Sequence, residues 1–203
     1  MAAGVPFRYF LADEVYGQAR GLRTWLEDHG VRYVLAIPVD EALPGTDGTV
    51  RQAREWHTFV PENAYERRSC ADGAKGPREY DWGHLRLKPA GCGWERHLLI
   101  RRSTTANKKD KKTGRLVKET AFFLCHTPPG VTLTELVTAA GQRWMVEESF
   151  QAGKGQIGLD EHEVRKWCSW YRHTTVCMLA MAFLTVVRSR YIPSQPLTPD
   201  PSR

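Results

Sequence analysis

The sequence predicts an α/β fold in which a strand–helix–strand unit is followed by a β-rich region and then by helices. Three observations support this fold class. Apolar, aromatic segments at 7–12 and 31–38 flank an amphipathic segment at 18–28. The middle of the chain is rich in glycine, proline and scattered aromatic residues and lacks helical periodicity. From residue 132 onward, the spacing of the apolar residues becomes helical.

The first three elements form a βαβ unit. Residues 7–12 are predicted to be a strand, residues 18–28 a helix, and residues 31–38 a second strand. The helix ends at His29-Gly30, because glycine is the usual residue after a helix. Strand, helix and strand at this spacing imply parallel strands with a right-handed crossover.

Asp13 follows the first strand directly. In open α/β sheets, catalytic and ligand-binding groups lie at the carboxyl ends of the strands. An aspartate just before a helix is also a common helix cap. Asp13 is therefore either a site residue or a capping residue.

Residues 39–126 are interpreted as a β-rich insertion between the two parts of a core domain, 1–38 and 127–190. Residues 82–87 alternate as a strand does. Residues 95–101 and 119–126 resemble the two arms of a β-hairpin. Trp56, Trp82 and Trp94 lie in this region, and core packing is favoured for each. The alternative is that one of them stacks on an extruded base.

The predicted hairpin tip, residues 101–118, is strongly basic. Such a cluster can follow a phosphate backbone without reading sequence, and the net charge of +6 favours a polyanionic partner. The alternative is a solvated loop. Against one acid, Asp110, the tip carries Arg101, Arg102, Lys108, Lys109, Lys111, Lys112, Arg115 and Lys118.

Helices complete the chain. Residues 132–140 form a short helix, with Thr132 as N-cap and Glu135 completing a capping box. A long helix over 162–189 has a nearly apolar second half, so we expect it to contribute most to the core. The tail, 191–203, is rich in proline and polar residues and is expected to be disordered.

Between these helices, residues 143–154 carry an unusual stripe. At about 100° per residue, Arg143, Glu147 and Lys154 fall within roughly 40° of one another, and Phe150 falls on the same stripe. A carboxylate placed between two cations on the face toward the protein is a candidate site residue. The alternative is ordinary solvated decoration of a helix.

The five cysteines show no C-x-x-C spacing, which suits a reducing cytosol. Zinc sites built on Cys125-His126, or on Cys92 with His97, fit no common ligand spacing and are disfavoured. No signal peptide is visible, and the apolar run at 174–187 is too short to span a bilayer. We therefore expect a cytoplasmic protein with no membrane partner.

Two segments carry a resemblance to a known family. Ala-Asp-Glu-Val-Tyr-Gly at 12–17, followed by Tyr-Val-Leu-Ala at 33–36, resembles the second-aspartate region of bacterial insertion-sequence transposases of the DDE superfamily. Arg143, Glu147 and Lys154 match the R-x3-E-x6-K part of the signature of one group of these enzymes. The resemblance covers roughly residues 4–190.

The resemblance implies an RNase H-like core in which three carboxylates hold two divalent ions, Mg²⁺ or Mn²⁺, for DNA strand cleavage and transfer. By position, Asp13 would be the second aspartate and Glu147 the glutamate, and both would be catalytic metal ligands. Arg143 and Lys154 would contact DNA phosphates. Glu148 is the rival of Glu147, but the spacing favours Glu147.

The sequence departs from the family pattern at two places. Ala140 stands where the full signature has a tyrosine, so one phosphate contact is in doubt. Only 12 residues precede Asp13, and none is acidic, so the first aspartate has no place. We therefore expect a truncated transposase with an incomplete RNase H-like core and an exposed sheet edge, which binds metal poorly and cuts nothing alone.

Three functions follow from these patterns. The first is a bacterial, nucleoid-associated DNA transposase in truncated form. The second is a non-catalytic DNA-binding remnant, acting as a homodimer or in assembly with an intact transposase. The third is an unrelated α/β protein in which Arg143, Glu147 and Lys154 are surface residues.

Overall fold

The computed structural model of the chain describes residues 6–73, 76–91, 93–110, 113–163 and 165–191. It divides into two compact units, a first unit of Met1–Arg143 and a second unit of Trp144–Arg203. Each unit is described by itself.

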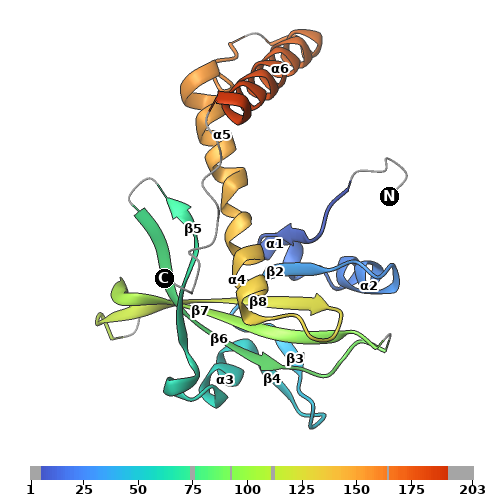
Figure 1. The fold of residues 1–203 in the computed structure, drawn as a ribbon, viewed down its shortest axis with the longest axis vertical. Coiled ribbons are helices and arrows are strands. Elements are labelled where there is room, and N and C mark those ends of the chain that lie inside the picture. The colour runs from blue at the N-terminus through green and yellow to red at the C-terminus, as the bar shows by residue number, and fades with distance from the viewer. Residues whose placement is uncertain (1–5, 74–75, 92, 111–112, 164, 192–203) are drawn as a thin grey trace. The chain divides into compact units, whose positions relative to one another are not determined.

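The first unit is built on one six-stranded mixed sheet (Figure 1). The first two strands pair in parallel, and the other neighbours pair antiparallel. A separate two-stranded ribbon is formed by β3 (Ala42–Pro44) and β4 (Val50–Gln52). In spatial order the strands of the sheet are β1 (Phe10–Ala12), β2 (Tyr33–Ile37), β8 (Leu116–Thr127), β7 (Glu95–Lys109), β6 (Gly76–Arg86) and β5 (Glu66–Gly73).

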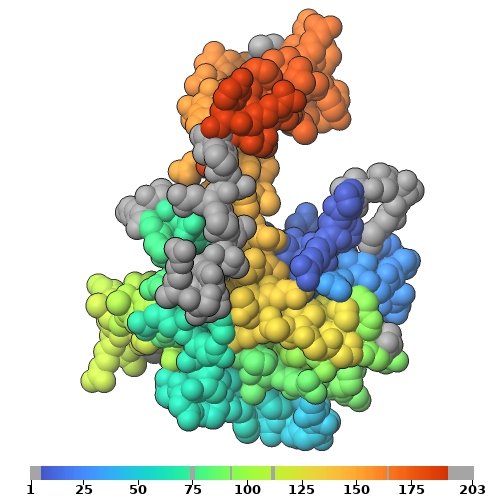
Figure 2. Space-filling model, in the orientation of Figure 1, coloured from blue at the N-terminus to red at the C-terminus, as the bar shows by residue number. Residues whose placement is uncertain are grey.

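Helices cover both faces of this sheet. On one face, α4 (Leu133–Gln142) packs against the strands through Leu136, Val137 and Ala139. On the other face lie α2 (Arg20–Asp28), the β3 ribbon strand and α3 (Ala53–Trp56). Figure 2 shows α4 in yellow, in close contact with the strands beneath it. Two short 3-10 turns, His57–Phe59 and Glu62–Ala64, follow α3.

The strand sequences explain the two cores, because successive side chains of a strand point to opposite faces. In β2, Val34 belongs to the core under α4, whereas Tyr33 and Leu35 belong to the core under α2. In β8, Phe123 and Leu124 divide in the same way. Strands that are apolar on both faces are typical of sheets covered on both sides.

The predicted βαβ unit is confirmed. β1 and β2 are parallel, with Phe10 opposite Tyr33 and Ala12 opposite Leu35. Their connection contains α2 and a separate short helix, α1 (Glu14–Gly17). Gly30 follows the C-cap of α2 and has a φ of +59°, a conformation that glycine adopts without a steric penalty.

The sheet continues across the boundaries expected for the insertion. β2 pairs with β8 from Tyr33–His126 to Ile37–Phe122, and β8 pairs in turn with β7. The predicted hairpin is present, although its arms are longer than expected. Residues 39–126 thus contribute four strands to the sheet that contains β1 and β2. The mixed α/β class is confirmed.

The second unit contains α5 (Trp144–Ile157) and α6 (Trp167–Tyr191). His173 Nε2 lies 3.0 Å from the Gly158 carbonyl oxygen, and the Cys177 thiol donates to the Ile157 carbonyl at 3.5 Å. Gly153 lies against Met181, whose Sδ would be 3.1 Å from an added Cβ. These close contacts pack the two helices together.

The expectation that the long helix contributes most to the core is wrong. Among the described residues of α6, only Cys177 is buried. Leu179 and Phe183 are 70% and 65% exposed. The apolar residues of α6 lie on all sides of the helix, and one neighbouring helix can cover only one of these sides. The core instead lies on the two faces of the sheet. The predicted tail beyond residue 191 lies outside the described residues.

Candidate functional site

Asp13 lies at the carboxyl end of β1 and is the N-cap of α1. Its side chain is exposed, and its Oδ1 accepts hydrogen bonds from the backbone N–H groups of Val15 and Tyr16, at 3.1 and 3.4 Å. The capping role is therefore confirmed. Both bonds use the same oxygen, so capping does not occupy Oδ2.

Close packing of α1 on β2 holds this carboxylate in place. The buried Gly17 lies so near β2 that an added Cβ would stand 1.7 Å from the Ala36 carbonyl oxygen. The Gly17 N–H also donates to the Asp13 carbonyl oxygen at 2.8 Å. Only glycine fits here, and it brings the first turn of α1 down onto the sheet.

The second group of predicted site residues begins at the end of α4. Arg143 is the C-cap of α4 and keeps helical dihedral angles (φ −54°, ψ −35°). Glu147 stands in the first turn of α5 and is exposed, and Glu148 is half-buried. Lys154, in the last turn, lies 4.0 Å from the Asp160 carboxylate, and both side chains are more than half exposed.

The expectation that this stripe faces the protein is wrong. Val146 and Phe150 are each 57% exposed. Among the described residues of α5, only Gly153 is buried. Asp13 belongs to the first unit and Glu147 to the second, so the approach of these two carboxylates stays a prediction.

The basic hairpin has a well-defined turn. Asp110 Oδ1 accepts from the Thr113 N–H at 2.7 Å, and the Asp110 carbonyl accepts from the Gly114 N–H at 2.9 Å. The single acid of the tip therefore shapes the turn. The hairpin end projects from the body of the first unit, in yellow-green in Figure 2. Lys108, Lys109 and Arg115 are exposed on it, whereas Lys111 and Lys112 lie outside the described residues.

Three other cations of this segment have partners elsewhere in the first unit. The Arg101 guanidinium lies 4.6 Å from the centre of the Tyr80 ring. Arg102 donates two hydrogen bonds of 2.7 Å to Glu62, and its side chain is 12% exposed. Lys118 Nζ donates to Asp81 at 3.1 Å. The exposed basic surface of the described hairpin therefore centres on Lys108, Lys109 and Arg115.

Comparison with known families identifies the chain's relatives. The family model described as the transposase DDE domain matches residues 3–183. The chain belongs to this transposase family. A comparison with curated proteins found no match.

For a transposase, DNA is the implied partner class, and divalent ions are the general cofactors of the family. In the part of the chain that the structure describes, no group of three or more His, Cys, Asp or Glu side chains could hold a metal ion. The oxygen ligands of Asp13 and Glu147 suit Mg²⁺ in type, but two carboxylates in separate units do not form a complete set. We therefore derive no reaction step through a metal.

The disfavoured zinc sites also lack a ligand set among the described residues. Cys125 is fully buried, and burial raises the pKa of its thiol, which disfavours the thiolate that zinc needs. His97 is buried beside Glu95, with 3.3 Å between Nε2 and the carboxylate. Cys92 lies outside the described residues.

The tryptophans of the transposase differ in their surroundings. Trp56 and Trp82 are buried, and their indole N–H groups donate to the carbonyls of Leu43 and Arg68. Core packing is therefore confirmed for these two. Trp94 is half-buried and stacks on His126, with 4.9 Å between ring centres.

None of the helices described is both long and apolar enough to cross a bilayer.

Proposed function

We propose that the chain acts in DNA transposition, with the metal-dependent cleavage and transfer of DNA strands as the chemistry of its family. The observation that carries the proposal is the transposase DDE match over residues 3–183, which includes Asp13 and Glu147. The position of Asp13 supports it, because this carboxylate stands at the carboxyl end of a parallel strand.

In this proposal, β1, β2 and the neighbouring strands belong to an RNase H-like core. Asp13 and Glu147 would be two of the carboxylates that hold Mg²⁺ or Mn²⁺, and such ions would supply the Lewis-acid chemistry on which the family's reaction at phosphorus depends. Arg143 and Lys154 contact DNA phosphates on either side of Glu147. Their charges would hold the strand near the carboxylates.

The hairpin provides a second contact with DNA. Lys108, Lys109 and Arg115 are exposed on a projecting hairpin, as phosphate contacts require. Arg101 and Arg102 would add positive potential from the strand behind it. Assembly of two chains, or of this chain with another transposase, would bring further basic surfaces onto the same DNA.

A second candidate function is DNA binding without catalysis. What favours it is the basic hairpin, whose exposed Lys108, Lys109 and Arg115 can contact DNA phosphates without any carboxylate site. In this case the chain would recognise DNA and modulate transposition without cutting. The two functions differ in one observable, metal-dependent nicking.

The test is nicking of supercoiled plasmid DNA in Mg²⁺ or Mn²⁺ by the wild-type chain and three variants. Asp13→Asn keeps the helix cap, since asparagine caps as well as aspartate. Glu147→Gln removes the proposed ligand, and Glu148→Gln is its matched control. Catalysis predicts nicking that is lost in the first two variants and kept in the third. Absence of nicking by the wild type, with DNA binding retained, supports the non-catalytic function.

DNA binding is tested separately with a Lys108→Gln/Lys109→Gln variant. Removing two phosphate contacts should lower the slope of log affinity against log salt by about 2. Arg54→Gln/Lys88→Gln removes two exposed cations away from the hairpin and is the control. Equal slopes for the two double variants would refute the hairpin contact.

A further inference from the structure

A pocket of about 270 Å³ lies between α2 and the β3 ribbon strand, on the α2 face of the sheet. Arg20, Arg23 and Glu27 line it from α2, at a helical spacing that places them on one side of that helix. Arg96 of β7 and Glu41, just before β3, complete its charged lining. None of these residues belongs to the predicted carboxylate site or to the hairpin tip.

The charges that line this pocket do not balance, because three guanidinium groups share two carboxylates. Arg23 donates a hydrogen bond to Glu41 at 2.7 Å, and the Arg20 guanidinium lies 3.9 Å from the same carboxylate oxygen. Glu27 is occupied by two hydrogen bonds from Arg96. The lining therefore carries one positive charge in excess.

The excess charge is unfavourable because the arginine at its centre is withdrawn from water. The Arg23 side chain is 10% exposed. A guanidinium has several N–H donors, and in the part of the chain that the structure describes, Glu41 is the one hydrogen-bond partner of Arg23. A buried charge that is not fully compensated is destabilising. Because Arg23 lines the pocket, an anion inside it would accept from the remaining donors and complete the pairing.

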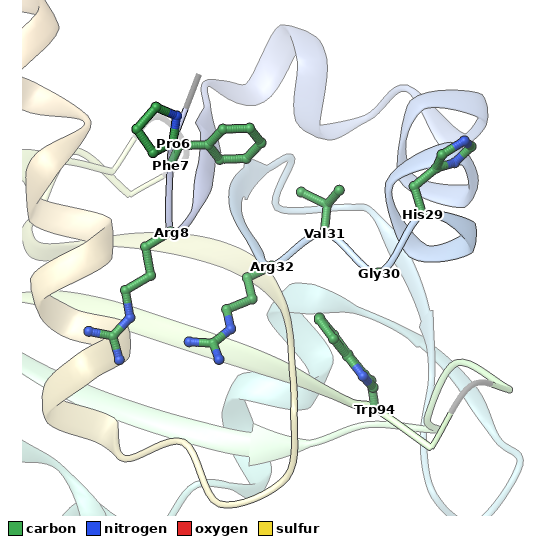
Figure 3. A pocket seen from close by; sticks show the side chains of 8 residues that line it. All are labelled: Pro6, Phe7, Arg8, His29, Gly30, Val31, Arg32 and Trp94. Atoms are coloured by element: carbon green, nitrogen blue, oxygen red, sulfur yellow. The ribbon is translucent and has the colours of Figure 1, made fainter. Parts of the chain in front are cut away.

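The larger pocket at the amino ends of β1 and β2, of about 860 Å³, has no such buried arginine in its lining (Figure 3). Figure 3 shows the side chains of Arg8 and Arg32 extending in the same direction, and both approach the Glu135 carboxylate, at 2.8 and 3.6 Å. These side chains are 69% and 33% exposed, so water solvates the charge that Glu135 does not neutralise. The smaller pocket therefore makes the stronger case for a bound anion.

We propose that the pocket between α2 and β3 binds a phosphate group, which accepts hydrogen bonds from Arg20 and Arg23. The planar fork of a guanidinium matches the oxygens of a phosphate. A water molecule takes up about 30 Å³, so a cavity of about 270 Å³ has room for a tetrahedral oxyanion. A carboxylate presents its oxygens in one plane, whereas a phosphate can meet two guanidinium groups and still present an oxygen to water.

The rest of the lining offers no surface on which a base could stack. Leu43, Leu87 and Leu124 are buried beneath the charged residues. Among the described residues that line the pocket, none is aromatic. The phosphate itself is then the recognised group, and inorganic phosphate and the terminal phosphate of a DNA strand share this chemistry. A phosphate inside a duplex would not reach Arg23. The inference goes beyond the proposed function and does not rest on it.

The experiment is equilibrium dialysis of radiolabelled inorganic phosphate against the full chain, at an ionic strength held constant with chloride. Arg20→Gln should weaken phosphate binding about 10-fold, as expected for the loss of one charge-assisted hydrogen bond. The Arg20 side chain is 76% exposed, so its loss should not unfold the chain. Arg54→Gln removes an exposed arginine of α3 outside the pocket and should bind as the wild type does.

Arg23→Lys provides a second variant, because it keeps a positive charge beside Glu41 and removes the guanidinium fork. It should also weaken phosphate binding. In the wild type, phosphate at about 20 times its Kd should raise Tm by about 5 °C relative to chloride of equal ionic strength. This rise should shrink in Arg20→Gln and persist in Arg54→Gln. If Arg23→Lys does not fold, Arg20→Gln decides the question.

Competition separates the two sources of phosphate. Displacement by a 5′-phosphorylated oligothymidylate, but not by its 5′-hydroxyl form, would assign the pocket to the end of a strand. Displacement by neither would assign it to free phosphate, and both results support the inference. Equal displacement by the two oligonucleotides would overturn it. So would equal phosphate affinities for the wild type, Arg20→Gln and Arg54→Gln, or the absence of phosphate binding by the wild type. Plasmid nicking tests the proposed function independently of these results.

Discussion

Glu27→Ala should destabilise the first unit strongly, because Glu27 joins α2 to the sheet through a buried ion pair. Its side chain is 9% exposed. Arg96 of the β7 strand donates two hydrogen bonds to it, from Nε at 2.9 Å and from Nη2. The Tyr33 hydroxyl of β2 donates a third, at 2.6 Å. Removing the carboxylate leaves the guanidinium and the hydroxyl without this acceptor.

The magnitude follows from the burial of the partners. Breaking a buried ion pair costs about 3–5 kcal/mol, and Arg96 is 26% exposed, so the lower end of that range applies. A loss of about 3 kcal/mol corresponds to a fall in Tm of about 10 °C for a unit of this size. Circular dichroism during heating measures this shift.

Glu66→Ala is the matched control. Glu66 also accepts two hydrogen bonds from one arginine, Arg68, at 3.1 and 2.5 Å, but the Glu66 and Arg68 side chains are 53% and 34% exposed. Exposed ion pairs contribute little to stability, so the Tm should hardly change. If the two alanine variants lowered Tm equally, the reasoning from burial would be wrong.

Three further predictions concern the same unit. Burial raises the pKa of the Glu27 carboxyl, but hydrogen bonds from Arg96 and Tyr33 and the charge of Arg96 outweigh it and hold this pKa below its usual range. In the unfolded chain a glutamate has a pKa of about 4.3, so in acid the unfolded chain binds more protons than the folded chain. The free energy of unfolding should therefore fall as pH drops below about 5, and less steeply in Glu27→Gln, as acid titrations of stability would show. Gly17→Ala should destabilise by about 1–3 kcal/mol or more because its Cβ would clash with the Ala36 carbonyl, whereas Gly21→Ala in α2, where nothing lies within 4 Å, should stabilise by up to about 1 kcal/mol in urea unfolding. Trp82→Ala, at a side chain 1% exposed, should cost about 3–5 kcal/mol in the same assay.

The strand–helix–strand unit could be predicted because its signals are local. The apolar pattern of β2 and the glycine after α2 depend on neighbouring residues alone. Thr132 was identified as an N-cap for the same reason, and its hydroxyl accepts from the Glu135 N–H at 3.3 Å. The side chain of Glu135, however, bonds Tyr9 and Arg8. A local motif cannot show which distant group competes for a carboxylate.

The burial of the helices could not be predicted, because it depends on partners far away in the chain. The apolar content of α6 indicated a core helix, yet Leu179 and Phe183 are exposed. The charged stripe of α5 indicated a face toward the protein, yet Phe150 is exposed. Composition measures how much a helix can bury, but only the fold determines what covers it.

The candidate site residues also divide into those with a local sequence signal and those without one. Asp13 could be identified because its position after a strand is a local signal. Arg8, Arg32 and Trp94, which line one pocket, were not singled out as a group, since Arg32 and Trp94 are 62 positions apart in the chain. The one available sign was that both arginines lie at the start of predicted strands, 7–12 and 31–38, and parallel pairing brings such residues to one end of the sheet.

The two readings of Asp13, as a cap and as a site residue, are compatible, and the geometry explains why. Capping through Oδ1 fixes the carboxylate at the end of β1, and the contact of Gly17 with β2 fixes the helix that is capped. Asp13→Asn removes the charge and keeps the cap, whereas Asp13→Ser keeps a cap and removes the second oxygen. If both variants retain the wild-type Tm but change metal-dependent nicking, the cap serves to position a catalytic group. If both variants retain the wild-type Tm, and neither they nor the wild type nick DNA, Asp13 is a structural residue. The proposed DNA binding then does not depend on Asp13.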